Sequence, residues 1–345
     1  MVALAEVVRR ARGRVTGRLE SLPILALSVH SACNCKCVMC DIWKANSEKR
    51  EISATDLDRH VADIRALNVQ RIMLTGGEPL LHSNLWTLCA RLQEIGARIT
   101  LVTTGLLIEP HAVDITRYVD AVVISLDGPA EVHDAIRRIR GGFDRIARGV
   151  GTLRTATPKP RLIARSVVQR NNFASLAETV DAAHRLGFDE LSFLAADVTT
   201  QAFNRPEPWT DDRIAEVAVG ARDLPALEAS IDTAVERHPD RFREGFVAGG
   251  RASLDRIQRY YAALAGRADR PAVACNAPWI SAVLEPGGAL RPCFFHQPYD
   301  AMPDGLASTL NSERAIAFRR ALNVEQNPTC QRCVCSLNLP LSRSV

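Results

Sequence analysis

The stretch VHSACNCKCVMCDIWK, residues 29–44, contains four of the ten cysteines of this 345-residue chain and follows a short apolar run that predicts a strand. Cys33, Cys37 and Cys40 are separated by three and then two residues, a spacing that lets one loop wrap three corners of a cubic iron–sulfur cluster. Thiolates are the usual ligands of such clusters, about four to a cluster. Three protein ligands would therefore leave one iron open.

A structural zinc loop is the alternative interpretation of the same stretch. Zinc would need a fourth ligand, which Cys35 or His30 could provide, so counting ligands does not exclude it. The position of the loop favours the cluster, because it follows the first strand of a barrel-like sheet. Active residues of such sheets gather at the C-terminal ends of the strands.

Apolar runs and helical patterns alternate through the first 200 residues. Strands are predicted at residues 24–29, 71–75, 99–103, 121–126, 161–168 and 190–195. Helical periodicity occupies residues 54–66, 84–95, 112–119, 142–156 and 176–186. Six β-then-α units in a row predict an α/β fold with a parallel sheet and outer helices, a partial (β/α)6 TIM-like barrel.

The cysteine spacing resembles the signature of radical S-adenosylmethionine (radical SAM) enzymes, with Met39 where that family usually has an aromatic or other bulky residue. Gly76-Gly77-Glu78-Pro79 is similar to the GGEP segment of the family, and Ser125-Leu126-Asp127-Gly128 to its SLDG segment. The resemblance covers roughly residues 22–200. It implies a 4Fe–4S cluster that binds S-adenosylmethionine (SAM) and cleaves it reductively to a 5′-deoxyadenosyl radical, which abstracts hydrogen from a substrate.

The resemblance also implies which residues contact SAM. Glycines let a backbone approach a ligand, and the carboxylate of Glu78 complements the ammonium group of SAM. Arg165 could bind the SAM carboxylate with its guanidinium fork or pair with a structural acid, and Leu194 would cover the adenine. The full expected set is Gly76, Gly77, Glu78, Pro79, Thr103, Thr104, Ser125, Asp127, Arg165 and Leu194.

A second group of five cysteines lies in the last 71 residues, whereas Cys89 lies inside a helical pattern as a small buried hydrophobe. The group resembles the SPASM and twitch appendages of radical SAM enzymes, which carry auxiliary iron–sulfur clusters. The cysteines are too few for a full SPASM domain. The shorter twitch form would bind a second 4Fe–4S cluster through Cys275, Cys293, Cys330 and Cys333.

Cys335 departs from that set, and it could replace Cys333 as the fourth ligand or pack nearby. A four-cysteine zinc knuckle is the alternative for the whole group. Four protein ligands would close the cluster to substrate, which favours electron transfer. If Cys333 or Cys293 were not a ligand, an open iron could bind substrate directly.

Four regions are expected: an N-terminal basic helix (1–21), the radical SAM core (22–200), a helical connecting and substrate region (201–272), and a small α+β twitch domain (273–345). The twitch domain should contain two short strands joined by Pro286-Gly287-Gly288 and a helix at about 312–322. The basic helix could rest on an anionic membrane or dock a partner. We expect it to pack on the main domain.

Composition places the chain in the cytoplasm. No stretch approaches about 20 uninterrupted apolar residues, and the N-terminus lacks the layout of a signal peptide. Cytoplasmic thiols stay reduced, so metal or redox chemistry explains ten cysteines better than disulfides do. With 24% charged residues and a net charge of +4, nothing indicates nucleic acid as a partner.

An auxiliary cluster that accepts electrons suits oxidation of a substrate radical, such as dehydrogenation or peptide cross-linking. Only about 22 residues precede the first strand, too few for the winged-helix module typical of peptide-modifying members. We therefore expect an oxidoreductase acting on a polar small molecule of sugar, aminocyclitol or nucleoside type, in cofactor or natural-product biosynthesis. Reduced flavodoxin or ferredoxin is the electron donor that the family implies.

Substrate contacts are expected among polar residues near strand ends, namely Asp197, Thr199, Asn204, Arg205 and His296. A buried ion pair explains Asp197 equally well, and His296 could face either the substrate or the auxiliary cluster. Three other functions remain open. They are a radical SAM peptide maturase, a redox-neutral decarboxylase or C–C bond-forming enzyme, and a non-catalytic iron–sulfur or zinc scaffold.

Overall fold

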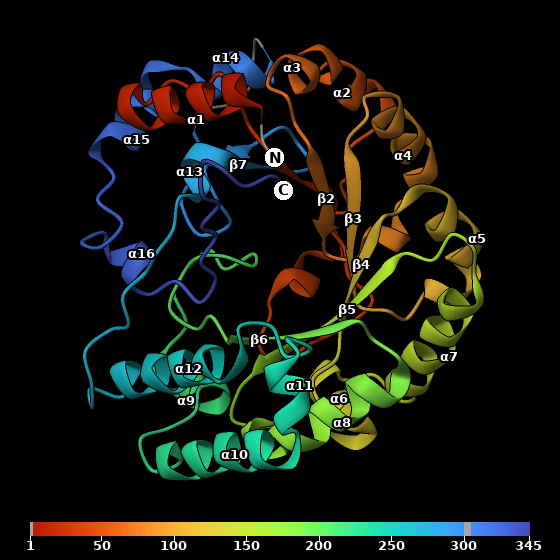
Figure 1. Ribbon diagram of the computed structural model, residues 1–345, viewed down its shortest axis with the longest axis vertical. Coiled ribbons are helices and arrows are strands. Elements are labelled where there is room, and N and C mark those ends of the chain that lie inside the picture. Colours follow the sequence, from red (N-terminus) through yellow and green to blue (C-terminus); the bar gives the residue numbers. More distant parts are fainter. Residues whose placement is uncertain (1–2, 300–304) are drawn as a thin grey trace.

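The computed structural model describes residues 3–299 and 305–345, and its strands form one curved sheet with helices outside it (Figure 1). The strand order is β6-β5-β4-β3-β2-β1-β7-β8. All neighbouring pairs from β6 to β7 are parallel, and only β7 and β8 pair antiparallel. The strands are β1 (Ile24–His30), β2 (Arg71–Gly76), β3 (Arg98–Thr103), β4 (Ala121–Ser125), β5 (Arg161–Val168), β6 (Glu190–Ala195), β7 (Ser281–Leu284) and β8 (Leu290–Arg291).

The first six strands neighbour each other in chain order, so each connection crosses the outer face and the predicted parallel partial barrel is confirmed. The outer helices are α2 (Ala54–Asp58), α3 (Val61–Ala66), α4 (Leu85–Glu94), α5 (Ile108–Tyr118), α6 (Ala130–Arg137), α7 (Gly142–Thr155) and α8 (Leu176–Leu186). The single helix expected over residues 54–66 is in fact two helices. The amide of His60 bonds the carbonyl of Leu57, an i to i−3 bond that tightens the turn and interrupts the helix.

The two faces of the strands differ in burial. In β5, residues Leu162, Ala164, Ser166 and Val168 are buried, whereas Ile163, Arg165 and Val167 between them are partly exposed. Successive side chains of a strand point to opposite faces, so one set packs under the outer helices and the other lines the inside of the barrel. The partly exposed set shows that the inside is hollow.

Residues after β6 form the helices α9 (Asp211–Val217), α10 (Leu224–Arg237), α11 (Pro239–Arg243), α12 (Gly250–Leu264), α13 (Ala277–Ile280), α14 (Leu306–Leu310), α15 (Glu313–Ala321) and α16 (Pro328–Gln331). The expected hairpin around Pro286 and the expected helix near 312–322 are present as β7-β8 and α15. In addition, β7 pairs with β1 and so extends the main sheet rather than standing apart from it. Among the described helices, none is long and apolar enough to cross a membrane.

The N-terminal helix α1 (Leu4–Thr16) packs on the main body, as expected, and holds the other end of the chain. The guanidinium of Arg10 is buried and donates to backbone carbonyls of the C-terminal segment, at 2.8 to 3.2 Å, those of Leu339, Pro340, Leu341 and Arg343. Buried Glu6 accepts hydrogen bonds from Ser21 and Asn68. The two ends of the chain therefore lie side by side near β7 (Figure 1).

Replacing Arg10 should loosen this contact. In the variant Arg10→Met, four carbonyls lose a charged donor, and we expect the free energy of unfolding in urea to fall by about 2–4 kcal/mol. The matched control is Arg9→Met on the exposed side of the same helix, which should change it by less than about 0.5 kcal/mol. Equal stability of the two variants would show that the Arg10 contact contributes nothing.

Candidate functional site

The loop after β1 brings Cys33, Cys37 and Cys40 close enough to influence each other electrostatically. Burial raises the pKa of Cys33 to about 12 and that of Cys40 to about 11, and in both the charge of Cys37 adds to the effect. Cys37 differs, because hydrogen bonding from the Cys35 thiol and the nearby charge of Arg137 lower its pKa to about 6. The loop thus contains one thiol that ionises readily beside two that need a cation to ionise.

Arg137, which the sequence did not indicate, contacts this loop directly. Its Nη1 lies 3.6 Å from the sulfur of Cys37, and its Nε donates to the fully buried carboxylate of Asp127 at 2.6 Å. The backbone around Arg137 also accepts from the loop, since the amides of Lys36 and Val38 donate to carbonyls at the end of α6. No pattern separates Arg137 from Arg138 and Arg140 beside it, so only the fold identifies it.

Of the two side chains offered as a fourth zinc ligand, His30 is engaged outside the cysteine group and Cys35 contacts one of its members. His30 Nδ1 lies 2.9 Å from the amide nitrogen of Ala32, and Nε2 faces the carboxylate of Glu51 at 3.3 Å. The Cys35 thiol hydrogen bonds to Cys37. Within residues 3–299 and 305–345, no three His, Cys, Asp or Glu side chains converge on a position for a single metal ion. A cubane has its ligands at separate irons, so it does not require such convergence.

Gly76 and Gly77 bring two loops of the site together. A Cβ on Gly77 would lie 2.1 Å from the carbonyl oxygen of Ala32, and one on Gly76 would lie 2.3 Å from that of His30. The amides of Gly77 and Glu78 donate to the same two carbonyls, His30 and Ala32, at 2.8 and 2.9 Å. Because glycine has no side chain, the backbone at Gly76 and Gly77 can lie directly against the cysteine loop. The expected approach of these glycines to SAM stays a prediction.

Glu78 lies at the centre of this contact and is fully buried. One carboxylate oxygen accepts from the amide of Leu80 at 3.0 Å and the hydroxyl of Thr103 at 2.8 Å. The other accepts from the amide and hydroxyl of Thr104, at 2.7 and 2.6 Å. Four donors occupy about all the acceptor positions of a carboxylate. Glu78, Thr103 and Thr104 therefore have a structural role together, beside the SAM contacts predicted for them.

The other expected SAM contacts divide into two kinds. Asp127 is committed to the fold, since it accepts from Arg137 and from the amide of Val167 at 2.9 Å. Ser125 ends β4 and is partly exposed. Arg165 and Leu194 line a cavity, and in the described chain Arg165 forms no ion pair with an acid. Of the two roles considered for Arg165, pairing with a structural acid is thus not observed.

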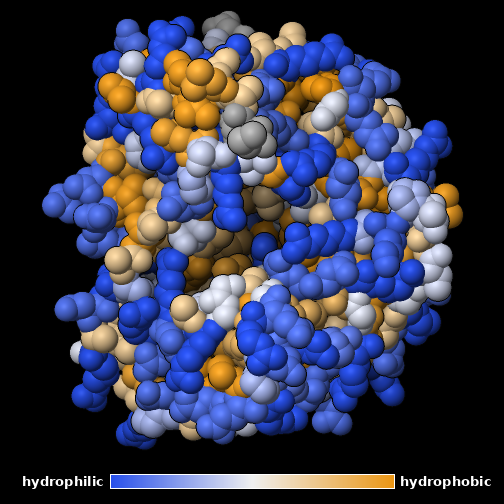
Figure 2. Space-filling view, in the orientation of Figure 1, coloured by the Kyte–Doolittle hydropathy of each residue, from blue (hydrophilic) through white to orange (hydrophobic). Residues whose placement is uncertain are grey.

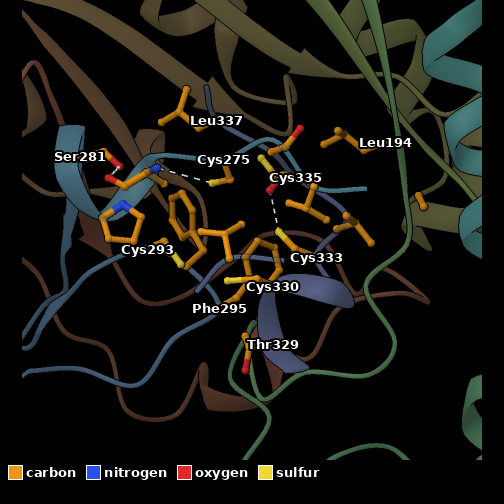
Figure 3. A pocket seen from close by; sticks show the side chains of 18 of the residues that line it. Leu194, Cys275, Ser281, Cys293, Phe295, Thr329, Cys330, Cys333, Cys335 and Leu337 are labelled. Atoms are coloured by element: carbon orange, nitrogen blue, oxygen red, sulfur yellow. Dashed lines mark hydrogen bonds between the residues drawn. The ribbon is translucent and has the colours of Figure 1, made fainter. Parts of the chain in front are cut away.

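That cavity, of about 720 Å³, is bounded by the inside of the barrel and by the C-terminal region. Its wall contains all five cysteines of the second group, Cys275, Cys293, Cys330, Cys333 and Cys335. Figure 3 shows their side chains around the same space, with Leu194 of β6 across from them. Burial raises the pKa of Cys293 to about 11 and that of Cys330 to about 12. Soft ligands that ionise only beside a cation suit an iron–sulfur cluster.

The contacts within this group do not show whether Cys333 or Cys335 is the fourth ligand. The thiol of Cys333 donates to the carbonyl of Cys335 at 2.6 Å, and both line the cavity. His296 Nε2 lies 3.3 Å from the sulfur of Cys330, so this histidine faces the auxiliary cysteines. The ligand role of each cysteine stays a prediction.

Two of the other predicted substrate residues, Asn204 and Arg205, contact the first cysteine loop. Asp197 and Arg205 form the fully buried ion pair that was the alternative for Asp197, at 2.9 Å. Arg205 also donates to the carbonyl of Met39 and stacks on Trp209 at 3.9 Å, and Asn204 donates to the carbonyl of Asp41. These side chains stabilise the loop in this structure. Thr199 lines a smaller cavity of about 410 Å³, next to the first.

The close contact at Gly77 can be tested by adding one methyl group. Gly77→Ala should displace the cysteine loop and lower the midpoint of thermal unfolding, because the new Cβ would collide with the Ala32 carbonyl. The matched control is Gly151→Ala in α7, where nothing lies within 4 Å and the helix should gain about 0.5–1 kcal/mol. Unchanged stability in Gly77→Ala would contradict the contact.

Comparison with known proteins gives matches to this fold and site. Residues 27–183 match the model of the Radical SAM superfamily. An AdoMet-dependent heme synthase of Methanosarcina barkeri is 29% identical over 168 residues, 48% of this chain and 48% of that protein. The mycofactocin maturase MftC of Mycolicibacterium smegmatis is 33% identical over 162 residues, 45% of this chain and 40% of that protein. Each match thus covers about half of the relative or less.

The fold as a whole has solved counterparts. Streptococcus suis SuiB bound to the precursor peptide SuiA is similar over 96% of this chain and 74% of that one, with a TM-score of 0.64 and 17% identity. The likeness therefore extends through the C-terminal region that contains the second cysteine group. Residues 27–183 thus match the radical SAM domain, and the chain as a whole, with its C-terminal region, has a fold similar to that of SuiB.

Proposed function

We propose that this radical SAM enzyme oxidises a substrate bound in the cavity that Arg165 and Leu194 share with the C-terminal cysteines. The cavity itself is the observation that carries the proposal. Arg165 and Leu194, two of the ten residues predicted to contact SAM, line one space of about 720 Å³ together with all five cysteines of the second group. A substrate in this space would lie between those two predicted SAM contacts and the group that accepts an electron.

The superfamily uses a 4Fe–4S cluster and SAM. A cluster bound by Cys33, Cys37 and Cys40 would supply the electron that cleaves SAM to methionine and a 5′-deoxyadenosyl radical. The chain contributes position and charge. Arg137 stabilises the thiolate of Cys37, and the contacts of Glu78 fix the start of the loop. Arg165, which has no acid partner among the described residues, is available for the SAM carboxylate.

With both groups bound, the shared cavity would allow an oxidation in two steps. Bound SAM would supply the radical carbon that takes a hydrogen atom from a substrate C–H bond, which would give 5′-deoxyadenosine. The auxiliary cluster would then take one electron from the substrate radical while one proton goes to solvent, a two-electron oxidation in all. Cys275, Cys293, Cys330 and either Cys333 or Cys335 would hold the accepting cluster. Reduced flavodoxin or ferredoxin as electron donor and a cytoplasmic location remain predictions from the family and the composition.

The substrate is less constrained than the chemistry. The polar small molecule expected from the sequence would meet a wall that is mostly apolar, which offers few partners to the hydroxyls of a sugar or aminocyclitol. Peptide maturation is the second candidate. It is favoured by the likeness to SuiB with its bound precursor peptide and to a mycofactocin maturase, whereas the heme synthase supports a small molecule.

An assay of SAM cleavage distinguishes the roles of the two cysteine groups. With dithionite as reductant, wild-type protein should form 5′-deoxyadenosine, measured by liquid chromatography. The triple variant Cys33→Ala, Cys37→Ala, Cys40→Ala should form none, whereas Cys275→Ala with Cys293→Ala should keep the reaction within about tenfold, because it leaves the SAM site intact. Cys89→Ala, a buried helical thiol outside both groups, is the control. Activity in the triple variant would overturn the assignment.

A further inference from the structure

The charged residues that line the large cavity are all basic. Its wall contains three arginines, Arg71 of β2, Arg165 of β5 and Arg256 of α12. Among residues 3–299 and 305–345, none of those lining it is Asp or Glu. The whole chain has 43 basic and 39 acidic residues, so this imbalance is local to the cavity. Three arginines therefore line this space, and no acidic residue among those described lines it with them.

Each of these arginines has a neutral partner. Arg71 donates to the hydroxyl of Thr100 at 3.0 Å, Arg165 to that of Ser192 at 3.3 Å, and Arg256 to that of Ser336 at 2.6 Å. None of the three forms an ion pair in the part of the chain that the structure describes. A guanidinium has five N–H donors in a fixed fork that fits carboxylate or phosphate.

Buried arginines elsewhere are of two kinds. Arg137 and Arg205 pair with acids, Asp127 and Asp197, whereas Arg10 and Arg319 donate to backbone carbonyls. Arg71 forms no ion pair, and burial and the like charge of Arg98 hold its pKa below the ordinary value against the opposing charge of Asp120. A partly desolvated positive charge without an ion-pair partner is costly unless a ligand supplies one.

The predicted cofactors account for part of this charge. A cubane with four thiolates carries about two negative charges, and bound SAM, with a carboxylate, an ammonium and a sulfonium, is positive overall. Arg165 is already predicted to bind the SAM carboxylate. Arg71 of β2 and Arg256 of α12, which is also within electrostatic reach of Cys335, are left for another anion.

The apolar part of the wall indicates that the rest of the ligand is apolar. The same wall contains the hydrophobic residues Phe193, Leu194, Ile257, Val273 and Leu337. In Figure 2 the middle of this face is hollowed, with hydrophobic side chains in its depth and mostly hydrophilic ones around it.

We propose that the cavity binds a ligand with an anionic group, a carboxylate or phosphate, on an otherwise apolar body, recognised by Arg71 and Arg256. This inference rests on the proposed function, because it takes the ligand of this cavity to be the substrate. The anionic group is the part of the substrate that these arginines would bind, and the carbon that reacts is not specified.

Equilibrium dialysis with anaerobically reconstituted protein tests the proposal. The probes are octanoate, octyl phosphate and the neutral octan-1-ol, which share one apolar chain. Octanoate or octyl phosphate should bind at least about tenfold more tightly than octan-1-ol, since a hydrogen bond to a charged group contributes about 1.5–3 kcal/mol. The tighter of the two anions identifies the group as carboxylate or phosphate.

Variants decide whether the arginines are responsible. Arg71→Gln and Arg256→Gln, tested separately and checked for unchanged iron content, should each weaken anion binding by about tenfold. The control is Arg259→Gln, an exposed arginine on the same helix as Arg256 that does not line the cavity, and it should bind as wild type does. Equal binding of anions and octan-1-ol, no binding of any probe, or unchanged affinity in both cavity variants would overturn the proposal.

These outcomes are distinct from failure of the proposed function. The SAM-cleavage assay uses none of the three probes, so it reports on the cysteine groups alone. SAM cleavage could be lost in the triple cysteine variant as expected while anion binding is unchanged in Arg71→Gln and Arg256→Gln. In that case the anion site is wrong and the proposed function stands.

Discussion

The buried carboxylate of Glu78 is the contact on which the arrangement of the site depends. It accepts hydrogen bonds from the end of β3, while the backbone amides of Gly77 and Glu78 hold the carbonyls just before Cys33. A buried charge without such donors is strongly destabilising, so the four hydrogen bonds are what allow it. The ends of β1, β2 and β3 are thereby joined, and the cysteine loop begins at a fixed point.

The rest of the loop is held by parts of the chain far away in sequence. The end of α6 accepts its amides and places Arg137 against Cys37. The segment before α9 adds Arg205 on the carbonyl of Met39 and Trp209 on the carboxylate of Asp41. A loop of soft ligands with few contacts of its own thus becomes rigid, which a site that must position a reactive group requires.

The sequence was sufficient for the barrel and insufficient for the contacts around the site. Strands β5 and β6 have the predicted bounds because apolar alternation is a local signal. The pairing of β7 with β1 joins residues more than 250 positions apart, which no local pattern indicates. The positions of Arg137 and of the Asp197–Arg205 pair could not be predicted from local sequence either. Polar residues at strand ends suggest ligand contacts, and only the three-dimensional structure shows which of them form ion pairs with each other.

If the two cysteine groups hold two separate clusters, the iron and sulfide content of anaerobically reconstituted protein will show it. The comparison is between wild type and a variant that has alanine at Cys33, Cys37 and Cys40. We expect about eight irons to fall to about four, with 4Fe–4S spectra in both proteins. About four irons falling to none would contradict this expectation, because the C-terminal cysteines would then hold zinc or no metal and could not accept an electron from the substrate.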